Sequence, residues 1–281
     1  KLQTFLTMVS VFFGIFIFVI LVGFSSGIEK GVKSQFEEDA TNRLAIRTRR
    51  TTKEFKGLNP GRLIQLRNSD FEEFNEKYSD NLEYKTSIYS VWRGQLLYNG
   101  EVGNYRVEGA YPDQQFIENQ RMVSGRFLNN NDINQLEKVA IIGNQIKQDL
   151  FKKINPVGEY VQISGINFKV VGVYADPGGK REESRVFIPL TTAQQIFNAG
   201  DKVRSLAYTV KMSDNFDEAV ALSMALTESF ENDIRTKHII SPDDRSAVRV
   251  DNTLEEAKRI YTLIATISYV FWFVGIGTII A

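Results

Sequence analysis

The sequence predicts an α+β domain that is held between two membrane-spanning helices. Three observations lead to this fold class. Residues 2–28 and 260–281 carry no charged side chain, whereas every acidic residue lies between Glu29 and Glu256. Within the charged middle, two segments show a strand–helix–strand pattern, and the stretch between them is rich in short strands and tight turns.

The two apolar ends are each long enough to cross a bilayer, because a spanning helix needs about 20 apolar residues. A cleavable signal peptide is the alternative for the first end, but its apolar run is long and Ser25-Ser26-Gly27 does not resemble a processing site. The second end stops without a flanking charge, and we therefore expect the sequence to be a piece of a longer membrane protein.

Both spans are predicted to continue as helical stalks beyond the membrane. Ile28, Val32 and Phe36 recur at four-residue spacing, which indicates one apolar helix face. Asn252 or Thr253 caps a second helix with Leu254, Ala257 and Tyr261 on one side. We expect these six residues to pack as stalks, although ordinary juxtamembrane helices explain the pattern equally well.

The first strand–helix–strand segment begins with RLAIRT at 43–48, where apolar and polar residues alternate. Ser69 opens a capping-box pattern before a helix with Phe71 and Phe74, and EYKTSIYSV at 83–91 is a β-rich strand. The second segment contains a strand at 206–212, a helix at 214–235 and a strand at 247–250. Together they predict a split ferredoxin-like arrangement.

Residues 93–203 are predicted to form a β-rich insert within this arrangement. Asn99-Gly100 is a strong hairpin signal between two strands. Further strands are expected at 138–143, 160–174 and 185–190, with a second hairpin turn at Gly165-Ile166-Asn167. Short helices are expected at 144–151 and 191–197. The predicted divisions are 1–28, 29–92, 93–203, 204–250 and 251–281.

The composition excludes most catalytic chemistry. The chain has no cysteine and a single histidine, His238, so thiolate metal sites, cysteine nucleophiles and multi-histidine sites are not expected. No phosphate-binding glycine motif occurs. Lys plus Arg and Asp plus Glu both total 34, which argues against a nucleic-acid partner. We expect no catalytic residues, cofactor site or metal site.

Two charged segments are candidates for contact with a partner. The loop after the 160–174 hairpin carries Lys180, Arg181, Glu182 and Glu183 next to a Pro-Gly-Gly tip, which suits either a contact loop for another subunit or a solvated connection. Arg47, Arg49, Arg50 and Lys53 form a basic cluster near the stalk. That cluster suits a lipid headgroup or a partner, or is simply a solvated strand end.

The order of motifs resembles MacB-like ABC transporter permeases. The apolar N-terminal segment KLQTFLTMVSVFFGIFIFVILVGFSSGI is similar to their first membrane helix. VSGRFLNNND (123–132), EKVAIIGNQIKQDLF (137–151), NPVGEYVQISGINFKVVGVY (155–174) and RVFIPLTTAQQIF (185–197) are similar to their periplasmic core domain. Each motif is weak alone, but together they cover most of the chain in the expected order.

The resemblance implies a domain that consists of a porter-like half and a β-rich insert. It also implies a protein of the bacterial inner membrane, with residues 29–257 outside the cytoplasm. It implies work by mechanotransmission, in which a cytoplasmic ABC ATPase subunit holds ATP and Mg²⁺ and this chain moves to drive export or extraction. The partners that the resemblance implies are membrane lipid and a second permease copy or related permease. Some members of the family also bind a periplasmic adaptor and an outer-membrane duct.

Two other functions fit the topology. A sensor domain of a histidine kinase or chemoreceptor shares the helix–domain–helix order, and a membrane-anchored enzyme is a third possibility that the missing motifs disfavour. The residues that follow the second apolar segment in the full protein would separate the first two. Two more spans indicate a permease, whereas a signalling linker indicates a receptor.

Overall fold

The computed structural model describes residues 11–16, 19–20, 23, 27, 42–213 and 215–280. They divide into two compact units, one of residues 42–253 and one that joins residues 1–41 with 254–281. Most of the predicted first span lies outside the described residues, and so do Ile28, Val32 and Phe36. The packing expected of those three residues therefore stays a prediction.

The unit of residues 42–253 contains twelve strands. They are β1 (Arg43–Thr48), β2 (Leu66–Arg67), β3 (Leu82–Tyr98), β4 (Glu101–Ala110), β5 (Arg121–Gly125), β6 (Val139–Gly143), β7 (Tyr160–Ile163), β8 (Ile166–Ala175), β9 (Arg185–Pro189), β10 (Lys202–Val203), β11 (Ser205–Val210) and β12 (Val248–Asn252). The helices are α2 (Asn68–Lys77), α3 (Gln114–Ile117), α4 (Asn130–Asn134), α5 (Asn144–Ile146), α6 (Leu190–Ile196) and α7 (Phe216–Lys237), with a π-helical turn at Lys147–Phe151 and a 3₁₀ turn at Glu182–Ser184.

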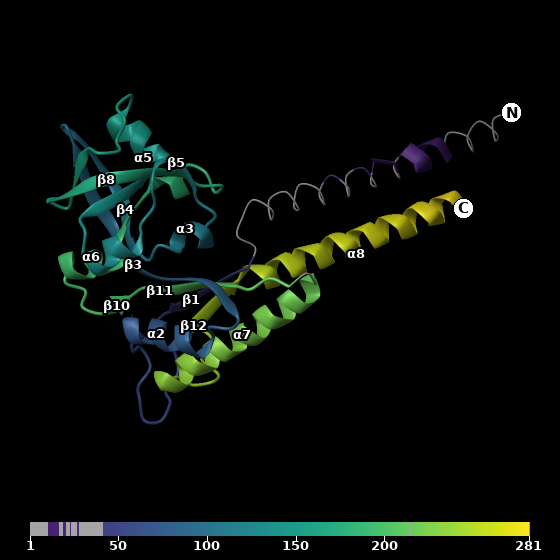
Figure 1. The fold of residues 1–281 in the computed structure, drawn as a ribbon. Coiled ribbons are helices and arrows are strands. Elements are labelled where there is room, and N and C mark those ends of the chain that lie inside the picture. The colour runs from purple at the N-terminus through teal and green to yellow at the C-terminus, as the bar shows by residue number, and fades with distance from the viewer. Residues whose placement is uncertain are drawn as a thin grey trace. The chain divides into compact units, whose positions relative to one another are not determined.

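The predicted split ferredoxin-like arrangement is present. Strands β12, β1, β11 and the first part of β3 lie side by side in that order, and all three pairings are antiparallel. Helices α2 and α7 cover one face of this sheet (Figure 1). We call these elements the ferredoxin-like half. Its strand β1 begins and ends at the predicted residues because Leu44 and Ile46 face the core.

The insert closes into a ring of six strands, which we call the barrel half. Strand β3 pairs with β4, β4 with β9, β9 with β6, β6 with β8, β8 with β7, and β7 returns to β3. The turn at Asn99-Gly100 has positive φ at both residues, as a two-residue hairpin turn requires. Because the ring is closed, few strand edges of the insert are left unpaired.

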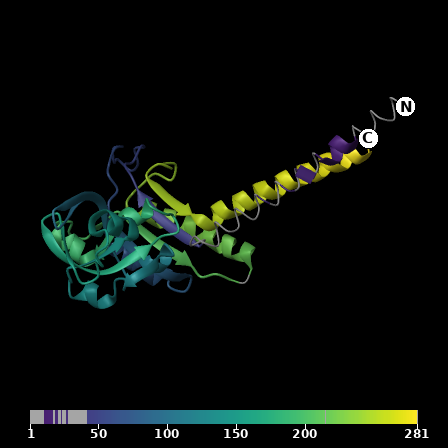
Figure 2. The ribbon, with the colours of Figure 1, turned by 90° about the horizontal axis from the view of Figure 1, so that it is seen from above.

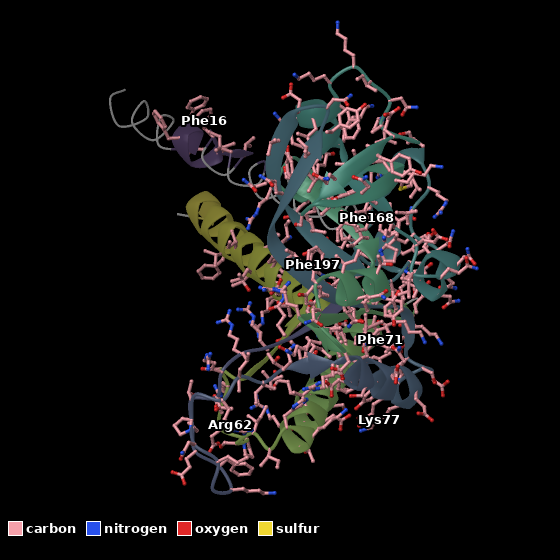
Figure 3. All side chains as sticks on the ribbon, turned by 90° about the vertical axis from the view of Figure 1, so that its left-hand side faces the viewer. Phe16, Arg62, Phe71, Lys77, Phe168 and Phe197 are labelled. Atoms are coloured by element: carbon pink, nitrogen blue, oxygen red, sulfur yellow. The ribbon has the colours of Figure 1, made fainter. Side chains whose placement is uncertain are left out.

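Strand β3 belongs to both halves. Its residues 82–88 pair with β11, and its residues 89–98 pair with β4. It therefore continues as a strand through the expected boundary at 92/93, although its register with β4 shifts there, between Val91 and Gly94. Each half also has its own apolar core. Figure 3 places Phe168 in the barrel half and Phe71 in the ferredoxin-like half, and both side chains are buried.

Two local expectations are wrong by a few residues. Helix α2 is preceded by Arg67 rather than capped by Ser69, because the Asp70 carboxylate accepts the amide N–H of Arg67 at 2.7 Å. The second hairpin turns at Ser164-Gly165, where both φ angles are positive, so Ile166 and Asn167 already belong to β8.

In the other unit the longest described element is α8 (Thr253–Ile280), whose first residue still belongs to the domain. Residues 11–16 and 19–20 are also helical. Across the described ranges, no helix is both long enough and apolar enough to cross a membrane.

Candidate functional site at the joint of the chain ends

The two ends of the domain leave from neighbouring strands. Strand β1 opens the domain and β12 closes it, and the two pair antiparallel with Leu44 opposite Asn252. Figure 2 shows β1 and β12 side by side. The segments that enter and leave the domain are therefore attached to one place on one sheet.

A side chain fastens the two ends to each other. The hydroxyl of Thr253 accepts the amide N–H of Arg43 at 2.9 Å and donates to the Arg43 carbonyl oxygen at 3.0 Å. One residue earlier, the buried amide of Asn252 donates to the hydroxyls of Ser223 and Thr227 on α7, both at 3.1 Å. We call Arg43, Asn252 and Thr253 the joint.

The side chain of Arg43 connects the joint to the barrel half. Its guanidinium lies 2.9 Å from Glu118, which follows α3, and Glu118 lies 3.2 Å from Arg185 on β9. Arg185 also lies 3.8 Å from Glu108 on β4, and Glu108 pairs with Arg106 at 3.0 Å. We call these five residues the charged network. It crosses from β1 to the barrel within a largely buried path.

Burial makes this network costly to break. The side chains of Arg185 and Glu108 are 11% and 8% exposed. Burial raises the pKa of Glu108, while Arg106 and Arg185 oppose that rise by stabilising the charged form. Removing one partner would leave the remaining charges less well compensated in a poorly solvated place, which is more damaging than losing a surface ion pair.

Helix α3 adds an apolar contact along the same path. The chain enters α3 after β4 of the barrel half, and its Ile117 packs with Ala45 of β1 and Ala207 of β11. Glu118 of the charged network is the next residue in the chain. The two halves are thus connected by a shared strand, a small apolar contact and a chain of ion pairs.

The predicted contact loop is divided between exposed and anchored residues. Lys180 and Arg181 are exposed. Glu182 forms an ion pair with Arg185, and its carbonyl oxygen accepts the hydroxyl of the buried Tyr174 at 2.8 Å. The carboxylate of Glu183 accepts the amide N–H of Asp176. Only the first two side chains are therefore free to contact a partner, and that role stays a prediction.

The predicted stalk residues on α8 lie on one helix face. Leu254 and Ala257 are buried and Tyr261 is partly buried, and Ile264 continues the same face. This spacing agrees with the expected apolar stripe. Since Ile28, Val32 and Phe36 are outside the described residues, their pairing with this stripe stays a prediction.

The basic cluster does not act as one group. Arg50 donates to the carbonyl oxygen of Gly61 at 2.8 Å, and the amide N–H of Lys53 donates to Asp244. Arg47 and Arg49 instead line a cavity, together with Lys202 and Arg204 from a distant part of the chain. Among the residues described, no group of three His, Cys, Asp or Glu side chains is placed to hold a metal ion.

Sequence reasoning missed the charged network. Arg43, Glu118 and Arg185 are far apart in the chain, and each stands at the end of an element where charge is ordinary. The sequence predicts Asn252 or Thr253 as a helix cap, but the bond of Thr253 to Arg43 depends on the pairing of β1 with β12.

The comparisons with known proteins agree on one family. The family profile described as the MacB-like periplasmic core domain matches residues 4–228. A macrolide export ATP-binding/permease protein MacB from Mannheimia succiniciproducens is 24% identical over 289 residues, covering 99% of this chain and 43% of that protein. The Campylobacter jejuni (strain 81-176) protein of the same name is 29% identical over 229 residues, covering 79% of this chain and 34% of that protein.

Two solved structures share the fold. The periplasmic region of MacB from Actinobacillus actinomycetemcomitans superposes with a TM-score of 0.64 at 17% identity, covering 82% of this chain and 98% of that one. The extracellular domain of the noncanonic ABC-type transporter YknZ from Gram-positive bacteria gives 0.58 at 16% identity, covering 75% of this chain and all of that one. The chain spans less than half the length of the curated relatives cited here.

Proposed function

Because the chain belongs to the family of the MacB-like periplasmic core domain, we propose that it is part of an ABC transporter permease that works by mechanotransmission. In this proposal a cytoplasmic ATPase subunit binds ATP and Mg²⁺ and hydrolyses ATP. The permease itself catalyses no reaction and converts the movement of its membrane segments into movement of the domain outside the cytoplasm, which drives export or extraction.

The observation that supports this proposal best is the joint. A domain can follow the movement of two membrane segments only if both are fixed to it firmly and close together. Residues 43 and 253 are bonded to each other and continue adjacent antiparallel strands. A displacement of either chain end would therefore act on the same edge of the ferredoxin-like half.

The charged network and α3 extend this argument to the barrel half. We propose that they transmit a shift at β1 to β9 and β4, since Arg43 is shared by the joint and the network. The uncharged segments 2–28 and 260–281 are the proposed membrane anchors in a bacterial inner membrane, with residues 29–257 outside the cytoplasm. The proposed partners are membrane lipid, a second permease copy or related permease, and a periplasmic adaptor with an outer-membrane duct.

The test uses the complete transporter with its ATPase in lipid nanodiscs. The 281 residues contain no cysteine, so an Asn104→Cys variant at an exposed position of β4, made in a permease from which any cysteine elsewhere has been removed, places one spin label on each copy. We expect the distance between the two labels to change when ATP and vanadate trap the ATPase, and to stay constant in an ATPase variant that cannot hydrolyse ATP. An unchanged distance under trapping would contradict mechanotransmission, and the absence of any associated ATPase would favour the receptor function.

A further inference from the structure

A cavity of about 400 Å³ lies where β1, β3 and β10 approach one another. Four cationic side chains line it: Arg47, Arg49, Lys202 and Arg204. No carboxylate is among its described lining residues. The remaining lining is mixed, since Leu63, Ile64 and Val203 are apolar and Ser90 is polar.

The segment 49–65 builds one wall of this cavity. The amide N–H of Ile64 donates to the carbonyl oxygen of Arg49 at 3.2 Å, and the hydroxyl of Thr48 donates to the carbonyl oxygen of Ile64 at 2.7 Å. Strand β2 then pairs with β10, which brings Lys202 across from the segment that follows β1. Hydrogen bonds therefore hold the cations together from two distant parts of the chain.

The positive charge of the cavity is only partly neutralised. Arg47 lies 3.2 Å from Asp251, but that carboxylate also pairs with Arg249. Neither Arg49 nor Lys202 has an ion-pair partner within the part of the chain that the structure describes. Burial lowers the pKa of Arg204, and the neighbouring Arg47 and Arg106 lower it further, while Glu108 acts in the opposite direction. An anion would relieve this repulsion.

One polar atom in the lining has no partner. The hydroxyl oxygen of Ser90 on β3 is inaccessible to solvent and makes no hydrogen bond within the described residues. Two other polar side chains of the lining are used within the fold, since Gln65 donates to the Val203 carbonyl oxygen at 2.7 Å and Thr48 donates to the Ile64 carbonyl oxygen at 2.7 Å. Ser90 is thus a lining residue whose buried hydroxyl has unused hydrogen-bonding capacity.

We propose that this cavity is a binding site for a phosphate-bearing ligand with one or two phosphate groups. Guanidinium groups match phosphate oxygens with paired hydrogen bonds. A single carboxylate neutralises one charge, whereas a phosphate group carries about −1.5 to −2 near neutral pH and better balances the charges of Arg49 and Lys202. The volume is within the usual range of small-ligand pockets, and the apolar edge accommodates a small organic body.

Binding of inorganic pyrophosphate to the full chain in phosphatidylcholine nanodiscs tests the site by calorimetry at low ionic strength. We expect saturable binding that Arg49→Gln with Lys202→Gln weakens at least tenfold. Arg121→Gln with Lys153→Gln removes two exposed cations elsewhere and is the matched control, with unchanged affinity expected. Equal weakening in both double variants, or binding that does not saturate, would overturn the proposal.

Two further arms define the ligand. Succinate, a dicarboxylate, is expected to bind at least tenfold more weakly than pyrophosphate, and equal affinity would overturn the phosphate assignment. Nanodiscs that contain phosphatidylglycerol distinguish the sources of phosphate. Competition with pyrophosphate in these discs supports a lipid headgroup, and unchanged pyrophosphate affinity supports a soluble phosphate. None of these binding experiments requires the ATPase subunit, so their results are independent of the mechanotransmission proposal.

Discussion

The hydroxyl of Thr253 is bonded to both backbone polar groups of Arg43, at 2.9 Å from the amide nitrogen and 3.0 Å from the carbonyl oxygen. Threonine at this position thus closes the domain by tying its last strand to its first. The hydroxyl adds these two bonds to the pairing of β1 with β12 and links two residues that are 210 positions apart in the chain.

Thr253→Val is expected to destabilise the domain by about 2 kcal/mol, because two hydrogen bonds are lost and the backbone groups of Arg43 are left partly buried. Chemical denaturation of the full chain measures this loss. Thr253→Ser keeps the hydroxyl and should retain most of the stability. A larger loss in Thr253→Ser than in Thr253→Val would show that packing by the methyl group, which valine keeps, holds the joint instead of hydrogen bonding.

Glu118→Gln is expected to destabilise the domain by about 2 kcal/mol, because Arg43 loses its carboxylate partner and the mostly buried Arg185 loses one of its three. Glu101→Gln is the matched control, since its ion pair with Lys152 is largely exposed and should contribute less than about 1 kcal/mol. Denaturant midpoints compare the two. Similar small losses would mean that the charged network contributes no more than surface pairs.

Asp70 should make stability depend on pH in acid. Burial alone would raise its pKa, but His238 and Lys237, whose nitrogen atoms lie 3.4 Å and 2.7 Å from its carboxylate, and the hydrogen bond from the Arg67 amide outweigh burial and lower the pKa to about 2. The unfolded value is near 3.8. The stabilisation is therefore complete above about pH 4 and is lost as pH falls toward 2, with a total of about 2 kcal/mol.

The measurement for Asp70 is the free energy of unfolding between pH 2 and 6 in the native chain and in Asp70→Asn. The difference between the two should shrink as pH falls through this window. Glu108 titrates with the opposite sign because its pKa is raised, so the comparison with Asp70→Asn is needed to isolate Asp70. A difference that stays constant with pH would contradict the assigned ion pairs.

Gly143→Ala is expected to displace the loop that carries Lys180 and Arg181. A methyl group at residue 143 would overlap the backbone of Glu183, so β6 or the loop must move, at a cost of about 2 kcal/mol or more. Trypsin should cut after Lys180 and Arg181 faster. Gly165→Ala is the control, because it has a positive φ but open space around it and should leave cleavage at 180–181 unchanged. Unaltered cleavage in Gly143→Ala would contradict this anchoring.

The sequence was enough to predict those elements whose conformation is determined by residues close to one another in the chain. β1 follows from its alternation, and the turn at Asn99-Gly100 follows from the residues that positive φ favours. The extent of β3 could not be predicted, because its two parts are stabilised by different partners, β11 and β4, that come later in the chain.

For the same reason, only some residues of the candidate sites could be predicted from the sequence. Arg47 and Arg49 stand out as a basic cluster in the sequence, but Lys202 joins them through the two-residue pairing of β2 with β10, which leaves no pattern to detect. Likewise, Glu118 follows a helix of only four residues, which is too short to show an apolar periodicity in the sequence. Its packing on Ala45 and Ala207 therefore could not be predicted.

The barrel half leaves the ferredoxin-like sheet and returns to it at one point, since the amide N–H of Arg204 donates to the carbonyl oxygen of Ile88 at 2.6 Å. The four-stranded sheet is thus topologically complete without the insert. In evolution, such an arrangement lets the inserted module be gained, enlarged or exchanged as one block, while the part of the protein that holds the chain ends keeps its sequence order and its fold.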